Sequence, residues 1–246
     1  MNLIRVPFLS AALIFAVAAR PQDTNSAAAS RAPQALQLPA PRLVELKAAD
    51  RTILKASYFA AAKSGPGVLL LHQSNRTRDS WDGVARQLAA AGINTLTLDM
   101  RGFGESGGTP STKLTDAERA KVRAMRPGDV DTAFQCLVSQ PGLKRDVIGV
   151  GGAGEFGVGR SVEVARQHSA EVKSLVLLSG ETLGGAQARV GYEFLHQAWQ
   201  LPELFAFSDD DEYPPTQDAM RLLYVTAGSP SKKLVHYSAA EDAPPK

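Results

Sequence analysis

The stretch that decides the fold prediction is residues 147–166, VIGVGGAGEFGVGRSVEVAR. It starts with an apolar run typical of a buried strand, continues through a glycine-crowded turn and ends in a helical pattern. A strand, a sharp turn and a helix also surround the G-x-S-x-G pattern, which exposes a nucleophilic serine. Here the turn reads AGEFG over residues 153–157, with no serine, cysteine or aspartate at its apex. The sequence therefore predicts a turn suited to acyl transfer that lacks the usual attacking atom.

Strand and helix patterns alternate on both sides of this turn. Such alternation predicts a mostly parallel eight-stranded sheet with helices on both faces, and sites at the carboxyl ends of its strands. The expected strands are residues 42–47, 52–59, 67–71, 93–98, 147–151, 172–178, 204–207 and 233–237. The expected helices are residues 81–91, 130–139, 158–168, 186–200 and 215–227.

Residues 107–127 interrupt the alternation. They begin with GGTPST and continue as a charged helical piece over residues 116–125. We expect a small lid-like insertion that overhangs the site, with a solvated surface excursion as the equal alternative.

Composition limits the classes of function. The 246 residues suit one α/β domain, 44% of them are apolar, and the net charge is +2. No basic block favours a nucleic-acid partner or a membrane surface. The single cysteine, Cys136, excludes an intrachain disulfide and lies in an apolar helical pattern, where we expect core packing.

The first residues resemble a signal peptide, which we assign to residues 1–19. Arg5 precedes an uncharged run that ends in the A-x-A pattern of residues 16–18. A flexible linker is expected over residues 20–39, followed by the domain over 40–246. We expect an exported protein, periplasmic or secreted, with no integral membrane segment after cleavage; a short apolar tail or an uncleaved anchor is the alternative.

Three further segments carry a family resemblance. They are residues 69–74 (LLLHQS), residues 97–106 (TLDMRGFGES), which resemble a D-x-R-G-x-G-x-S signature, and residues 174–180 (SLVLLSG). With the turn, they make the chain similar to the α/β-hydrolase superfamily, in its branch of dienelactone-hydrolase-like and S33-peptidase-like esterases. The resemblance implies that fold and a carboxylic-ester-hydrolase type of chemistry.

The resemblance also implies positions for the catalytic groups. The backbone N–H groups of Gln73 and Phe156 are the expected oxyanion donors, and His72 beside Gln73 is expected to pack rather than react. For the nucleophile, a count from Gly152 puts Gly154 at the apex, whereas a count back from Gly157 puts Glu155 there. Glu155 is thus a candidate nucleophilic carboxylate, or simply an acidic residue favoured in a first helical turn.

The sequence has a candidate for the acid of a triad but no histidine at the expected place of its base. Asp211 follows the seventh expected strand and resembles the family's acid, although its acidic neighbours also suit a helix N-terminus or a weak Ca²⁺ site. No histidine occurs after residue 237, where the family has its base and a last helix; Glu241 or Asp242 stands there instead. We therefore expect the last helix to be missing.

Three functions follow from these expectations. The chain is a weakly active or inactive relative of ester hydrolases, a non-catalytic module that binds a small apolar or acyl ligand, or a hydrolase that depends on Glu155 or on residues beyond Lys246. No cofactor is expected, because the glycine spacings of residues 149–157 alone do not make a nucleotide site. No metal is expected either, because no His and Cys cluster occurs.

Overall fold

The structure of the protein is a computed structural model that describes residues 40–184, 188–211 and 216–238. The expected signal peptide over residues 1–19, the linker over 20–39 and the tail after residue 238 lie outside the described residues. The predicted absence of a last helix also concerns that tail and stays a prediction.

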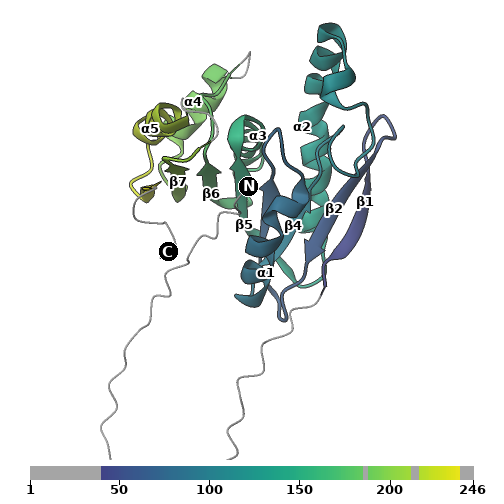
Figure 1. The fold of residues 1–246 in the computed structure, drawn as a ribbon. Helices are drawn as coiled ribbons and strands as arrows, with labels where there is room; N and C mark the ends of the chain where they lie inside the picture. Colours follow the sequence, from purple (N-terminus) through teal and green to yellow (C-terminus); the bar gives the residue numbers. More distant parts are fainter. Residues whose placement is uncertain (1–39, 185–187, 212–215, 239–246) are drawn as a thin grey trace, which may run out of the picture. The chain divides into compact units, whose positions relative to one another are not determined.

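The described residues form strands and helices in the predicted alternation (Figure 1). In chain order the elements are β1 (Arg42–Lys47), β2 (Ile53–Phe59), β3 (Gly65–Leu71), α1 (Asp82–Ala90), β4 (Asn94–Leu98), α2 (Asp116–Val138), β5 (Leu143–Ala153), α3 (Gly154–Gln167), β6 (Val172–Leu178), α4 (Ala188–Gln197), β7 (Glu203–Ser208), α5 (Thr216–Thr226) and β8 (Lys232–Tyr237).

The eight strands form one sheet in the order β1-β2-β4-β3-β5-β6-β7-β8. Strand β2 is antiparallel to both β1 and β4, and every other neighbouring pair is parallel. The prediction of an eight-stranded, mostly parallel sheet is confirmed. Because β3 to β8 all run in one direction, the loops that follow them gather at one edge of the sheet.

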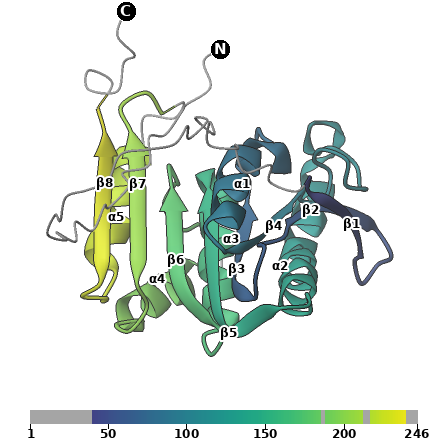
Figure 2. The ribbon, with the colours of Figure 1, turned by 90° about the horizontal axis from the view of Figure 1, so that it is seen from below.

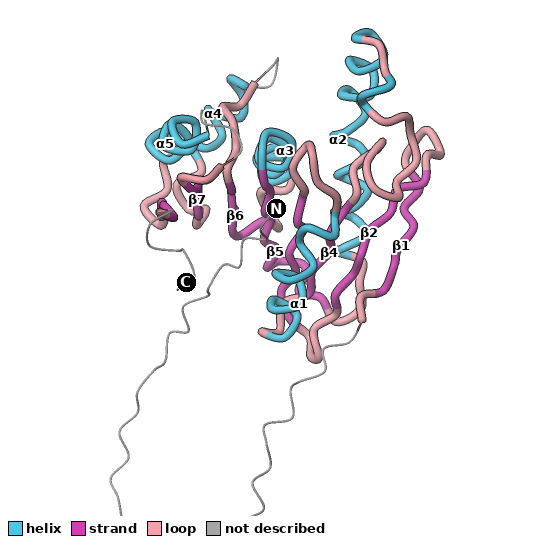
Figure 3. The backbone as a smooth tube through the Cα atoms, viewed as in Figure 1, coloured by secondary structure: helices cyan, strands magenta, loops and turns pink. Residues whose placement is uncertain are grey.

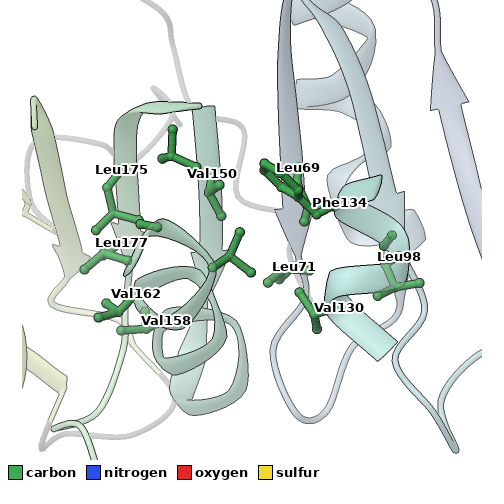
Figure 4. Close-up of a cluster of buried hydrophobic side chains, with 14 of the residues drawn as sticks. Leu69, Leu71, Leu98, Val130, Phe134, Val150, Val158, Val162, Leu175 and Leu177 are labelled. Atoms are coloured by element: carbon green, nitrogen blue, oxygen red, sulfur yellow. The ribbon is translucent and has the colours of Figure 1, made fainter. Parts of the chain in front are cut away.

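Helices cover both faces of the sheet, as predicted. Helices α2, α3, α4 and α5 pack in a row on one face, whereas α1 lies on the other (Figures 1 and 2). The main core lies under the row of four helices and is drawn in Figure 4. A separate small cluster of Phe59, Ala85 and Ala89 joins α1 to β2. Every residue of β4 and most residues of β3 are buried, because helices cover both faces of the sheet there.

Two helices begin earlier than predicted. The charged piece over residues 116–125 and the helix expected from residue 130 are one helix, α2, which continues through Pro127. Thr115 and Glu118 start it with a reciprocal capping box, and Pro127 lies inside the helix without ending it. The expected separate helices were therefore wrong, while the lid role of residues 107–127 stays a prediction. Helix α3 begins at Gly154 and not near Val158.

Within the described residues, no helix combines the length and the apolar character needed to cross a membrane.

Candidate functional site

The bend between β5 and α3 has Gly154 at its apex. Strand β5 passes directly into α3 (Figure 3), and Gly154, the first helical residue, has φ of 65°. This left-handed conformation favours glycine, because an L side chain is strained there. A Cβ atom at this position would stand 2.3 Å from Cγ of Gln73. Gly154 is therefore the residue at which the backbone turns, as in the count from Gly152; which residue holds the nucleophile's place stays a prediction.

Two other glycines hold strand and helix together at the bend. A Cβ atom on Gly152 would lie 2.1 Å from the carbonyl oxygen of Gly157, and one on Gly157 would lie 2.5 Å from the carbonyl oxygen of Leu71. The backbones of β3, β5 and α3 therefore touch where no side chain fits. This close packing explains why α3 starts at once in a segment whose glycines favour a loop.

Glu155 and Phe156 occupy the first turn of α3, past the bend. Glu155 is exposed and Phe156 is half-buried, with its ring edge-on to Phe103 at a centroid distance of 5.9 Å. Because Gly154 is the bend residue, the backbone N–H that directly follows it belongs to Glu155, one residue before the Phe156 donor named above. The nucleophilic role of Glu155 and the oxyanion role of Phe156 stay predictions.

The loop after β3 is held by a buried histidine. His72 lies 2.7 Å through Nδ1 from the carbonyl oxygen of Gln73, and the backbone N–H of Met100 donates to its Nε2 at 3.0 Å. Nε2 is thus an acceptor, Nδ1 carries the proton, and burial lowers the pKa of His72. His72 therefore packs and positions the loop, as expected. The Gln73 side chain fills the space that a nucleophile's side chain at the bend would need.

Asp211 lies after β7, as predicted for the acid of a triad, and its catalytic role stays a prediction. Its Oδ1 accepts a hydrogen bond from the Ser179 hydroxyl at 2.7 Å. Its Oδ2 accepts from the backbone N–H of Ser208 at 3.1 Å and from the Thr216 hydroxyl at 3.2 Å. Ser179 has φ of 45°, so a non-glycine residue takes a left-handed turn next to this carboxylate. Asp211 thus ties together the ends of β6 and β7 and the start of α5.

None of the chain's four histidines, all of them described, forms a hydrogen bond with Asp211. His72 is used as above, and His196 is exposed on α4. His168 lies 2.8 Å from Asp131 through Nε2. His236 lies 2.6 Å from Asp209 and stacks on Phe207, a carboxylate–imidazole pair that the sequence analysis missed. The structure therefore brings Gln73 against the bend, and it pairs Asp211 with hydroxyl and backbone groups and with no histidine.

The Asp99-to-Ser106 motif supplies structure rather than chemistry. Asp99, fully buried, accepts hydrogen bonds from the backbone N–H groups of Arg78 at 2.7 Å and of Glu105 at 3.0 Å. Arg101 donates to both oxygens of Asp129 in α2, at 2.8 and 2.7 Å, and to Asp50 in the β1–β2 turn. These bonds fold the loop after β4 against α2 and the turn.

A pocket of about 160 Å³ lies beside the bend, between α2, α3, α4 and the loop after β6. Its wall carries seven charged side chains, which are Arg123, Arg126, Arg160, Arg166, Glu155, Glu163 and Glu181. The sequence analysis did not find it; the only signal was the three-residue spacing of Arg123 and Arg126 on one helical face. In the described part of the chain no three His, Cys, Asp or Glu side chains are grouped to hold a metal ion.

We compared the sequence and the structure of the chain with those of known proteins. No protein-family model matches the chain. A stretch of 123 residues is 30% identical to the acyltransferase drtE of Aspergillus calidoustus, and it spans 50% of this chain but only 36% of that protein. Among solved structures, a dienelactone hydrolase from Anabaena variabilis superposes with a TM-score of 0.58 at 21% identity, covering 81% of this chain and 87% of that one.

An esterase from Butyrivibrio proteoclasticus, Est1E, solved with ferulic acid bound, superposes with a TM-score of 0.63 at 17% identity, covering 79% and 89% of the two chains. The α/β hydrolase GrgF from Penicillium sp. sh18 gives 0.61 at 16% identity, covering 81% and 90%. Strand order, bend and neighbours agree: the chain has the α/β-hydrolase fold.

Proposed function

We propose that the chain is a hydrolase-fold protein of the carboxylic-ester-hydrolase type that binds a small acyl or ester ligand beside the bend without triad-based turnover. One observation carries this proposal: Gly154 occupies the bend with φ of 65°, so no side chain stands where a serine would attack. The fold's neighbours include hydrolases and esterases, which supports the ligand class and not the loss of activity.

The proton-transfer machinery supports the same conclusion. A triad needs a carboxylate that orients a histidine, and a histidine that takes the nucleophile's proton. Both oxygens of Asp211 are hydrogen-bonded to other groups, and no histidine reaches it. Loss of a triad's nucleophile or base costs about 10⁶-fold in turnover, while oxyanion donors and binding retain about 10³-fold over water. Slow residual hydrolysis is therefore compatible with the proposal.

The binding part of the proposal rests on the site's position and on its relatives. The pocket opens beside the bend at the carboxyl edge of the sheet, where this architecture places ligands. One matched structure is a complex with a substrate analogue, and another holds ferulic acid. Those two proteins bind small molecules, and we extend small-ligand binding to this chain.

Labelling with a fluorophosphonate, together with p-nitrophenyl acetate turnover, tests the proposal. We expect no labelled serine and a rate that Ser161→Ala leaves unchanged, because Ser161 is fully buried in α3. Covalent labelling of any serine with loss of turnover would overturn the proposal.

A second candidate function is hydrolysis through Glu155. It is favoured by the exposed position of Glu155 on the pocket wall, one residue past the bend. Turnover that disappears in Glu155→Gln and survives in Ser161→Ala would support this function over the first.

We also propose that the protein is exported. Arg5, the uncharged run and the A-x-A pattern support cleavage near residue 18. Mass spectrometry of the mature N-terminus in extracytoplasmic fractions tests it, and an intact N-terminus on cytoplasmic protein would contradict it.

A further inference from the structure

The pocket beside the bend contains a buried cation that the protein itself does not pair. Arg126 in α2 is 8% exposed and lines the pocket. Its guanidinium stacks over the Phe156 ring, 4.1 Å from the centroid. Its Nε is buried and has no hydrogen-bond partner among the described residues. A buried charge without a hydrogen-bonded counterion is expensive, so such a group is retained where a ligand completes it.

Neighbouring charges explain why the protein leaves Arg126 unsatisfied. Asp129 lies nearby, but both of its oxygens already accept from Arg101. Glu155 attracts Arg126 electrostatically, yet no ion pair forms between them in the described structure. Burial, together with the like charges of Arg123 and Arg160, lowers the pKa of Arg126. The site therefore holds more positive charge around one buried guanidinium than its own carboxylates offset.

The rest of the wall is suited to the body of a small acid. Arg123 lies one helical turn before Arg126 on the same face of α2, and Arg160 approaches from α3 while it is paired with Glu163. Val162, Leu183 and the Phe156 ring add apolar surface. The volume of about 160 Å³ is below the roughly 300–1,000 Å³ of pockets for drug-sized ligands, and it fits an acid of a few carbons.

We propose that this pocket binds the oxyanion of a small organic acid, with Arg126 as the central ligand and Arg123 and Arg160 as supporting cations. The planar guanidinium, stacked on Phe156, is suited to donate two N–H bonds at once to a carboxylate or phosphate group. The inference deepens the proposed function, on which it rests for the ligand's place beside the bend, by naming the ligand's charged group.

A titration followed by ¹H–¹⁵N correlation spectra, including the arginine Nε–H signals, tests the inference on the full chain. The probes are sodium butyrate, its neutral ester methyl butyrate, and inorganic phosphate. We expect butyrate or phosphate to shift the Arg126 Nε–H signal saturably, and methyl butyrate to bind about tenfold more weakly or not at all. The tighter of the two anions identifies the carboxylate or the phosphate as the natural group.

Variants make the assignment specific. Arg126→Gln should weaken anion binding about tenfold, and Arg126→Lys should restore part of it, because charge returns without the planar stack. Arg119→Gln is the matched control: it removes a cation from an exposed pair on the same helix and should leave binding unchanged. If Arg126→Gln does not fold, the Nε–H shift in the wild-type protein decides the question.

The outcomes separate the two proposals. Equal affinity for butyrate and methyl butyrate, unchanged binding in folded Arg126→Gln, or no saturable shift with either anion would overturn the inference. Conversion of methyl butyrate to butyrate and methanol in the same tube, lost in a serine variant, would overturn the proposed function while leaving the anion site intact.

Discussion

Replacement of Arg101 by methionine should destabilise the fold more than any change at an exposed charge. The Arg101 and Asp129 side chains are 6% and 4% exposed, and two hydrogen bonds of 2.8 and 2.7 Å join them. Without its partner, Asp129 is a buried, unpaired carboxylate, and loss of one member of such a pair costs about 3–5 kcal/mol. The second pair, with Asp50, adds little because solvent screens the exposed Asp50 carboxylate.

Urea denaturation measures this cost without adding salt that screens charges. Arg101→Met keeps most of the side-chain stem, so the loss reports the guanidinium and not a cavity. A total stability of 5–15 kcal/mol is typical of native domains, so a loss of about 4 kcal/mol would lower the urea midpoint substantially. The double variant Arg101→Met with Asp129→Leu should recover about 1–3 kcal/mol relative to the sum of the single changes, because no buried charge is then stranded.

Arg119→Met serves as the control for charge removal in general. Arg119 pairs with Asp116 at the start of α2, where the two side chains are 44% and 97% exposed. Its loss should leave the free energy of unfolding nearly unchanged, because water screens an exposed ion pair. If the free energy of unfolding of Arg101→Met stays within about 1 kcal/mol of the wild-type value at an unchanged m-value, the hydrogen bonds of Arg101 to Asp129 do not contribute the stability assigned to them.

Two further predictions concern the stability contributed by Glu203 and by Gly154. Burial raises the pKa of Glu203 from 4.5 to about 7, so the folded state binds the proton more tightly than the unfolded state does. The free energy of unfolding of the wild-type protein, minus that of Glu203→Gln, should therefore fall as the pH rises from about 4.5 to 7, by at most about 3 kcal/mol. Urea titrations at several pH values measure this difference. A difference that is flat over this window would contradict the burial argument. Gly154→Ala should lower the stability measured by thermal denaturation by about 1–3 kcal/mol, because Gly154 has φ of 65° and an added Cβ would meet Gln73. Gly128→Ala, in α2, should raise the stability by about 0.5–1 kcal/mol, because an added Cβ would have no neighbouring atom within 4 Å and alanine favours the helix. Equal effects of these two changes would refute the assignment of Gly154 to the bend.

Most of the fold was predictable because its strands are marked by composition. Strand β3 is an apolar run of the kind that parallel strands show when both faces are covered, whereas β4 (NTLTL) and β6 (VKSLVLL) contain polar residues among the apolar ones. Helix starts were less predictable, since each depends on a local device: the capping box of Thr115 and Glu118 for α2, and one left-handed glycine for α3. Proline and glycine signals favoured breaks there, and capping and tertiary contacts outweighed them.

The site was predictable only where a motif places a residue. The place of Asp211 follows from its position after β7, and its partner Ser179 could not be inferred because 32 residues separate the two. The pocket was missed for the same reason. Arg126 and Arg160 lie on different helices. The Phe156 ring of α3 contacts the Arg126 guanidinium only because the bend after β5 sets the position of α3. Charge spacing along one helix cannot show what faces it.

Hydrogen bonding distinguishes the polar residues that hold the fold together from those of the pocket beside the bend. Asp99, Arg101 and Asp211 all end in hydrogen bonds to neighbouring elements, so each is accounted for by holding a loop in place. Ser161 is buried without a hydrogen-bond partner for its hydroxyl, but it belongs to the covered side of α3 and does not line the pocket beside the bend. Arg126 alone among these is buried, unpartnered at Nε and part of that pocket's wall. Folding gains nothing from an unpaired buried cation, and a bound oxyanion would supply the partner that the fold does not; Arg126 is therefore the group on which the proposed anion site depends.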